Sequence, residues 1–84
     1  MHPAKVQLRD FSYEELSKAI EIAKKAYIIK TNYGIDLFFD DVDDARFFIS
    51  KLKKKFRITI KMSTENLGFE SRAKFLFVYS IRKI

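Results

Sequence analysis

The clearest periodic pattern in the chain lies between residues 40 and 56. If the segment is a helix with 100° between successive residues, six apolar residues fall within about 120° of one another and define one core-facing side. They are Val42, Ala45, Phe48, Ile49, Leu52 and Phe56. Aspartates at 40, 41, 43 and 44 precede this pattern and lysines occupy its end, so both groups of charges favour the helix dipole. The sequence predicts a helix over residues 41–55.

An earlier helix is predicted to begin after Ser12, which has capping-box spacing with Glu15. Its apolar face repeats at helical intervals as far as Tyr27. Alternating or β-rich runs predict strands at 27–31, 35–39, 57–62 and 74–82. The first two strands would form a hairpin around Asn32-Tyr33-Gly34, with the glycine in the left-handed conformation. Residues 63–73 are expected to form a mobile loop.

Residues 1–84 are long enough for one domain. Residues 4–9 alternate weakly, so residues 1–10 are expected to form a flexible arm or a short edge strand. The element order α-β-β-α-β-β predicts an α+β fold, with two helices packed on one face of a four-stranded, mostly antiparallel sheet. The last strand would be central. The uncovered sheet face is expected to carry Lys30, Asp36, Phe38, Arg57, Thr59 and Lys61.

Charge is unevenly distributed along the chain. Residues 1–50 carry seven Lys/Arg and nine Asp/Glu, a net charge of −2, whereas residues 51–84 carry ten and two, a net charge of +8. This asymmetry favours an anionic partner for the C-terminal half, most often nucleic acid. Abundant surface lysine in a small thermophilic protein would produce the same pattern without a partner.

Catalysis is not expected. The single histidine is His2, there is no cysteine, and no acid and base pair falls in a common predicted cleft. The aspartates at 40–44 lack the alternating ligands and central glycine of a calcium loop, and helix capping explains them. No metal, cofactor or small-molecule substrate is predicted. The absence of cysteine, of a membrane-length apolar run and of a signal peptide indicates a cytoplasmic protein.

Binding to RNA is the favoured chemistry, because cations neutralise phosphates and exposed aromatics stack on unpaired bases. Phe47 lies opposite the apolar side of its helix, among basic residues. Phe75 and Phe77 partly resemble the stacking pair of RNA-recognition-motif proteins, but core packing is the preferred interpretation. The candidate RNA-binding residues are Phe47, Lys51, Lys53, Lys54, Lys55, Arg57, Lys61, Arg72, Lys74, Arg82 and Lys83.

Residues 33–84 resemble a known family. The pattern consists of Gly34-Ile35-Asp36 with Phe38 and Phe39, a helix, Lys61 with Ser63, Leu67-Gly68, and a final Tyr-Ser-Ile-Arg strand. It is similar to the central segment of the large-subunit export and assembly adaptors of archaea and eukaryotes, although their zinc-binding cysteine pairs are absent here. The small size, the basic C-terminal half and the lack of cysteine also resemble small archaea-specific proteins of the large ribosomal subunit, of crenarchaeal type.

These resemblances imply a structural constituent of the archaeal large ribosomal subunit that is monomeric when free. Its expected partners are rRNA and neighbouring large-subunit ribosomal proteins, with no membrane contact. Two alternatives remain open at this point. One is a DNA-binding chromatin protein, because small basic α+β domains also occur in that class. The other is a protein–protein adaptor in ribosome assembly, using Phe47 and the acidic start of its helix.

Overall fold

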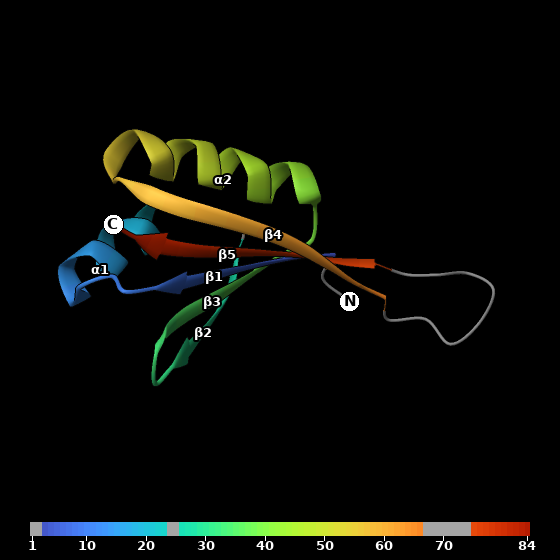
Figure 1. Ribbon diagram of the computed structural model, residues 1–84, viewed down its shortest axis with the longest axis horizontal. Helices are drawn as coiled ribbons and strands as arrows, with labels where there is room; N and C mark the ends of the chain where they lie inside the picture. The colour runs from blue at the N-terminus through green and yellow to red at the C-terminus, as the bar shows by residue number, and fades with distance from the viewer. Residues whose placement is uncertain (1–2, 24–25, 67–74) are drawn as a thin grey trace.

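The computed structural model describes residues 3–23, 26–66 and 75–84. The chain begins with β1 (Ala4–Arg9), α1 (Tyr13–Ile22), β2 (Tyr27–Thr31) and β3 (Gly34–Phe39). It continues with α2 (Val42–Lys55), β4 (Ile58–Asn66) and β5 (Phe75–Lys83) (Figure 1). β4 therefore includes residues 63–66, which the sequence had assigned to a loop. The rest of that expected loop lies outside the described residues.

The strands form one five-stranded mixed sheet in the order β2-β3-β1-β5-β4. Neighbouring strands are antiparallel except β1 and β5, which are parallel. The expected four-stranded, mostly antiparallel sheet with the order α-β-β-α-β-β is therefore wrong. The described elements follow the order β-α-β-β-α-β-β, and β5 is an interior strand while β1 takes the middle position.

The correction rests on β1, which is neither an arm nor an edge strand. It pairs along its whole length with β3 on one side and β5 on the other (Figure 1). Ala4, Val6 and Leu8 are fully buried, whereas the residues between them are only partly buried. The alternation predicted from sequence is real. It shows which side chains enter the core, but it contains no information on which strands lie on either side.

Both helices pack on the same face of the sheet and share one core with it. From α2 the core receives Ala45, Phe48, Ile49 and Leu52, with Val42 and Phe56 packed at its margin, as the sequence predicted. Phe77 also packs against this core, which confirms the core interpretation of that residue. The side chain of Phe75 lies outside the described residues.

α1 begins where the sequence predicted. Ser12 Oγ accepts a hydrogen bond from the Glu15 backbone N–H (3.2 Å), and the Ser12 N–H donates to Glu15 Oε1 (2.8 Å), which completes a capping box. The helix ends at Ile22, and Ala23 is its C-cap. The predicted continuation of its apolar face to Tyr27 is wrong, because Tyr27 is the first residue of β2.

The β2–β3 hairpin is confirmed, but Gly34 serves a different purpose from the one expected. Gly34 has φ +154 and pairs with Thr31 as the first residue of β3. A Cβ at this position would lie 2.0 Å from the Leu8 carbonyl oxygen of β1. Glycine is therefore required by the close approach of two strands, which no other residue would permit.

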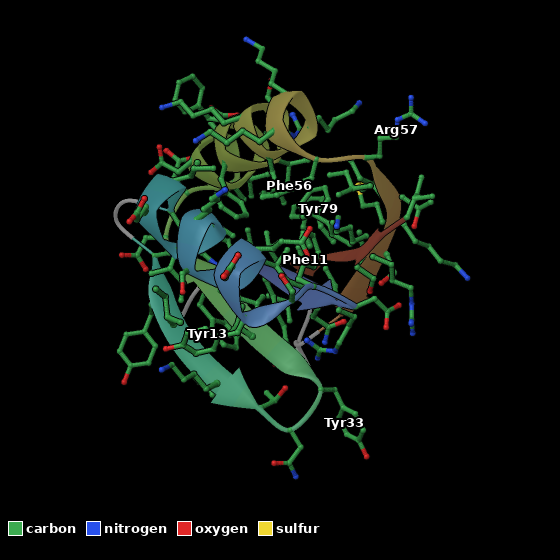
Figure 2. All side chains as sticks on the ribbon, turned by 90° about the vertical axis from the view of Figure 1, so that its left-hand side faces the viewer. Phe11, Tyr13, Tyr33, Phe56, Arg57 and Tyr79 are labelled. Atoms are coloured by element: carbon green, nitrogen blue, oxygen red, sulfur yellow. The ribbon has the colours of Figure 1, made fainter. Side chains whose placement is uncertain are left out.

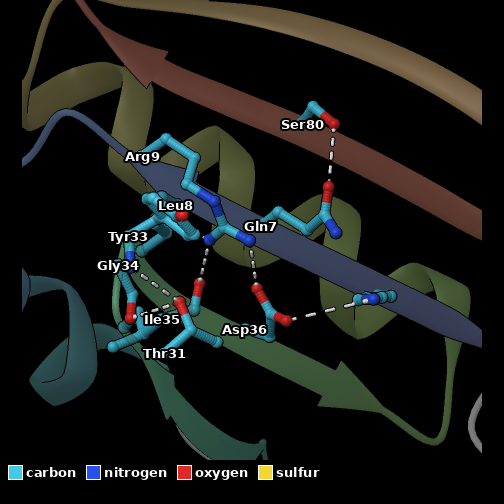
Figure 3. A network of polar contacts seen from close by, with 10 residues as sticks. Gln7, Leu8, Arg9, Thr31, Tyr33, Gly34, Ile35, Asp36 and Ser80 are labelled. Atoms are coloured by element: carbon cyan, nitrogen blue, oxygen red, sulfur yellow. Dashed lines mark hydrogen bonds and ion pairs between the residues drawn. The ribbon is translucent and has the colours of Figure 1, made fainter.

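Neither of the two described helices covers the second face of the sheet. Its residues include Asp36, Thr59 and Lys61, as predicted, and also Gln7, Arg9 and Ser80. Arg9 and Lys5 both form ion pairs with Asp36, at 2.9 and 3.9 Å, and Ser80 Oγ donates to Gln7 Oε1 at 3.1 Å (Figure 3). Lys30 was expected on this face, but it lies opposite Ile35 and therefore on the helix side.

Candidate nucleic-acid interface

The C-terminal half of α2 positions most of the predicted cations. Asp41 is the N-cap and its carboxylate accepts a hydrogen bond from the Asp43 N–H (2.8 Å). Two aspartates occupy the first turn and three lysines, at 53–55, occupy the last. The aspartates lie at the positive N-terminal end of the helix dipole and the lysines at its negative C-terminal end. The dipole therefore favours the lysines at that end of α2.

Phe47 lies on the exposed side of α2, as predicted, with 62% of its surface accessible. Lys51 follows it by one turn and places its Nζ 4.5 Å from the centre of the Phe47 ring. This is a cation–π contact between neighbours on one helix face. Lys51 therefore lies over one face of the Phe47 ring, and the two side chains are exposed next to each other on α2.

Arg57 links the helix to the sheet. It follows the C-cap Phe56 and precedes β4, and its side chain projects away from the body of the molecule at this junction (Figure 2). Lys53 and Arg57 line a shallow hollow of about 240 Å3 together with Phe56, Ile58 and Ile84. The two cations therefore share the corner where α2 passes into β4.

Lys61 lies on the other side of the sheet. It pairs with Ser80 in the β4–β5 ladder, and its side chain therefore points to the face that carries no helix. The lysines of α2 lie on the helix side. The structure thus separates the predicted cations into two groups, on opposite sides of β4, with Arg57 at the junction between them.

Other cations are engaged in ion pairs. Arg82 pairs with Asp10 at 2.9 Å, and Lys83 pairs with Glu15. Asp10 has φ 63, a left-handed conformation that aspartate tolerates better than most residues, just before α1 begins. Both residues are predicted to bind RNA, and in the structure both connect β5 to the start of α1 through these ion pairs, so their contact with RNA stays a prediction. Arg72 and Lys74 lie outside the described residues.

Six of the predicted cations have no ion pair with any part of the chain that the structure describes. We call them the unpaired basic surface: Lys51, Lys53, Lys54, Lys55, Arg57 and Lys61. All six are exposed. Because their charges are not neutralised by nearby carboxylates, they would act at full strength on an approaching polyanion.

Two features were missed by sequence reasoning. A cleft of about 340 Å3 separates α1 from the β2–β3 hairpin, and the exposed Tyr13 and Tyr33 contribute to its lining (Figure 2). On β4, Ile60 and Met62 are 38% and 55% exposed although their side chains point to the helix side. Neither feature follows from periodicity, because both depend on where a helix lies over the sheet.

The described ranges were compared with the features of a metal site and of a membrane-spanning helix. Residues 3–23, 26–66 and 75–84 contain no group of three or more His, Cys, Asp or Glu side chains arranged to hold a metal ion. Over the same residues, neither helix is long and apolar enough to span a bilayer.

Comparison with known protein families decides between the two resemblances. The family model described as the second domain of NMD3 matches residues 2–82. The chain belongs to this family. The NMD3 second domain matches nearly the whole chain, including β1, which the resemblance drawn from residues 33–84 had left out. Membership confirms the expected link to large-subunit export and assembly adaptors and does not support a crenarchaeal ribosomal protein. No curated protein gives a significant match.

Proposed function

We propose that this NMD3-type domain binds rRNA of the large ribosomal subunit as part of an assembly or export adaptor. The single observation that carries the proposal is the unpaired basic surface. Five of its six cations lie along the C-terminal half of α2 and at the α2–β4 corner, and Lys61 lies on the other face of β4. The cations of β1 and β5 instead form ion pairs with Asp10, Glu15 and Asp36. Five exposed cations close together on one helix end and the adjoining corner favour binding of a polyanion.

Electrostatics describes how the contact would work. Each lysine or arginine that meets a phosphate releases a condensed counterion, so affinity would be strong at low salt and would decrease as salt rises. Phe47 adds a surface on which an unpaired base could stack. The cations and the aromatic ring would position the domain on RNA with little dependence on base sequence. This suits a protein that recognises the large ribosomal subunit by the shape of its RNA.

An adaptor is preferred to a permanent constituent because the family is that of NMD3. An adaptor of this kind would act on ribosomal subunits and would be found with them in the cytoplasm, next to other large-subunit proteins. A DNA-binding chromatin protein is the competing function. The two are separated by sedimentation of native lysate, in which an adaptor should migrate with free large subunits and a chromatin protein with the nucleoid.

The direct experiment compares two double variants with the same change in charge. Lys54→Ala/Lys55→Ala removes two cations of the unpaired basic surface, and Lys18→Ala/Lys30→Ala removes two exposed lysines elsewhere. Each variant is titrated against large-subunit rRNA fragments at several salt concentrations. We expect the first to lower the slope of log K against log salt by about one to two units, since each phosphate contact contributes about one unit or less.

The control pair should leave that slope within error of the parent chain. Equal losses for the two variants would mean that net charge alone drives binding, and an unchanged slope for Lys54→Ala/Lys55→Ala would remove the α2 end from the interface. Stronger binding to duplex DNA than to rRNA under the same conditions would favour the chromatin function.

A further inference from the structure

β4 forms one edge of the sheet. It is the last strand in the order β2-β3-β1-β5-β4, and it is nine residues long. Its register with β5 runs without interruption from Ile58–Lys83 to Asn66–Phe75, so no bulge twists it away from a partner. Soluble proteins usually shorten, bend or cover such edges, because a long regular edge is a template for another strand.

The direction of the backbone groups along this edge follows from one hydrogen bond. The Ile84 N–H donates to the Arg57 carbonyl oxygen at 3.0 Å, so Arg57 and Ile84 are opposed as a hydrogen-bonded pair. In an antiparallel ladder such pairs alternate along the strand. Thr59, Lys61 and Ser63 therefore direct their N–H and C=O groups to β5, and the residues between them direct theirs outward: Ile58, Ile60, Met62 and Thr64.

Two of the residues with outward backbone groups, Ile60 and Met62, also carry exposed apolar side chains. Met62 is 55% exposed although its ladder partner Tyr79 is only 6% exposed, and Ile60 is 38% exposed opposite the fully buried Ile81. The cause is the position of α2, which packs on β1 and β3. On the helix side of β4, Ile60 and Met62 thus form an apolar strip that the described elements leave exposed.

Cations lie on both sides of this strip. Arg46 of α2 reaches over β5 and places its Nε 3.4 Å from the Tyr79 hydroxyl, next to Met62 in the ladder. Lys53 and Arg57 lie beside Ile58 at the other end, and Lys61 lies on the opposite face. Residues 58–64 contain no acidic residue. The edge therefore combines free backbone groups, apolar side chains and positive charge.

We propose that β4 accepts an additional strand from a protein partner, namely an extended segment in which apolar and acidic residues alternate. Backbone hydrogen bonds to Ile60 and Met62 would fix its register. Its apolar side chains would cover the helix side of β4, and its acidic side chains would face Lys61 and Arg57. Strand addition of this type obtains affinity from the main chain and specificity from alternate side chains. This proposal goes beyond RNA binding and gives the domain a second kind of partner.

Charge disfavours the two other occupants. A second copy of this chain, with its net charge of +6, would bring a second set of the same cations against the first. RNA would neutralise those cations but would leave the outward N–H and C=O groups and the apolar strip without complementary partners. An acidic extended peptide satisfies all three features at once.

The test uses the isotopically labelled 84-residue chain and a blocked nine-residue peptide of alternating valine and glutamate. Amide hydrogen exchange is followed by NMR with and without peptide. The free chain should already protect the amides of Thr59 and Lys61, which bond to β5, and leave those of Ile60 and Met62 unprotected. We expect the peptide to slow exchange at Ile60 and Met62, which would produce protection along the whole of β4.

Two substitutions of Met62 separate strand addition from simple charge attraction. Met62→Pro removes an outward N–H without touching the β5 ladder, and should weaken peptide binding by about tenfold or more. Met62→Lys adds a cation to the edge. Simple attraction would then bind the acidic peptide more tightly, whereas strand addition would bind it less tightly because the apolar contact is lost. Tyr33→Lys, which makes the same charge change at an exposed distant site, is the matched control.

Several results would overturn the proposal. These are peptide binding without protection of Ile60 and Met62, protection of β2 amides in their place, or tighter binding by Met62→Lys with Tyr33→Lys unchanged. Protection of the same two amides by increasing the protein concentration alone would assign the edge to a second copy. Protection by an rRNA fragment alone would assign it to RNA. Failure here would leave the salt dependence of rRNA binding untouched, so the two proposals are tested separately.

Discussion

Lys83 near the end of the chain forms an ion pair with Glu15, the residue that completes the capping box of α1. The pair joins β5 to the start of α1, two elements that are far apart in the sequence. The Lys83 ammonium, followed by the Ser12 N–H, lowers the pKa of Glu15 from 4.5 to about 2. The folded chain therefore holds this proton less tightly than the unfolded chain does.

The first prediction concerns acid. Because the folded pKa is lowered, the stabilisation from Glu15 is complete above pH 4.5 and is lost as pH falls towards 2. Glu15→Gln keeps a hydrogen-bonding side chain at the capping position but cannot titrate. Between about pH 5 and about pH 2, we expect the melting temperature of Glu15→Gln to fall less than that of the parent chain. Glu14→Gln, which removes the same charge at an exposed neighbouring position, is the matched control. Parallel melting curves for Glu15→Gln and the parent would show that the pair does not contribute.

A second prediction separates the two sides of α2. Leu52 is fully buried, so Leu52→Ala should reduce the free energy of unfolding by about 2–5 kcal/mol. Phe47 is 62% exposed, and Phe47→Ala should change the free energy of unfolding by about 1 kcal/mol or less. Chemical denaturation of both variants measures the difference. A loss for Phe47→Ala as large as that for Leu52→Ala would mean that the aromatic is covered in solution.

A third prediction concerns the contact between β1 and the start of β3. Gly34→Ala would place its Cβ against the Leu8 carbonyl oxygen and would also force alanine to a positive φ. We expect a loss of stability of about 1–3 kcal/mol or more. Asn32→Ala in the same hairpin connection is the control, and it should stay within about 0.5 kcal/mol. Equal stabilities for the two variants in urea would show that the strands separate enough to admit a side chain.

Local features of the fold could be predicted from sequence because their causes are local. Ser12 and Asp41 form the expected caps, and the apolar face of α2 is the face that is buried. The strand order could not be predicted in the same way. The alternation of residues 4–9 is satisfied equally by an edge strand and by a middle strand, because it reports only the two faces of a sheet. Lys30 was misplaced for a related reason, since one step along β2 changes the face.

The candidate interface shows the same limit. The sequence identifies every cation, but it treats Arg82 like Lys54 because both are basic residues in the C-terminal half. Their difference depends on Asp10, which is 72 residues from Arg82 and becomes its neighbour only through the β1–β5 pairing. The exposed edge of β4 was also hidden, because whether α2 covers Met62 depends on a helix position that periodicity does not define.

The middle position of β1 imposes an order on folding during synthesis. Residues 4–9 leave the ribosome before the helices and the other strands, yet one of their two neighbouring strands is β5. Gln7 contacts a residue 73 positions later. Until β5 has emerged, the nascent chain can build its helices and the β2–β3 hairpin, while β4 has no strand to join. Such distant contacts form late, because a long loop must close before they are made. The corner that carries the unpaired basic surface therefore takes its final form only after β5 has been made, so any partner of that surface has to wait for the last strand of this domain.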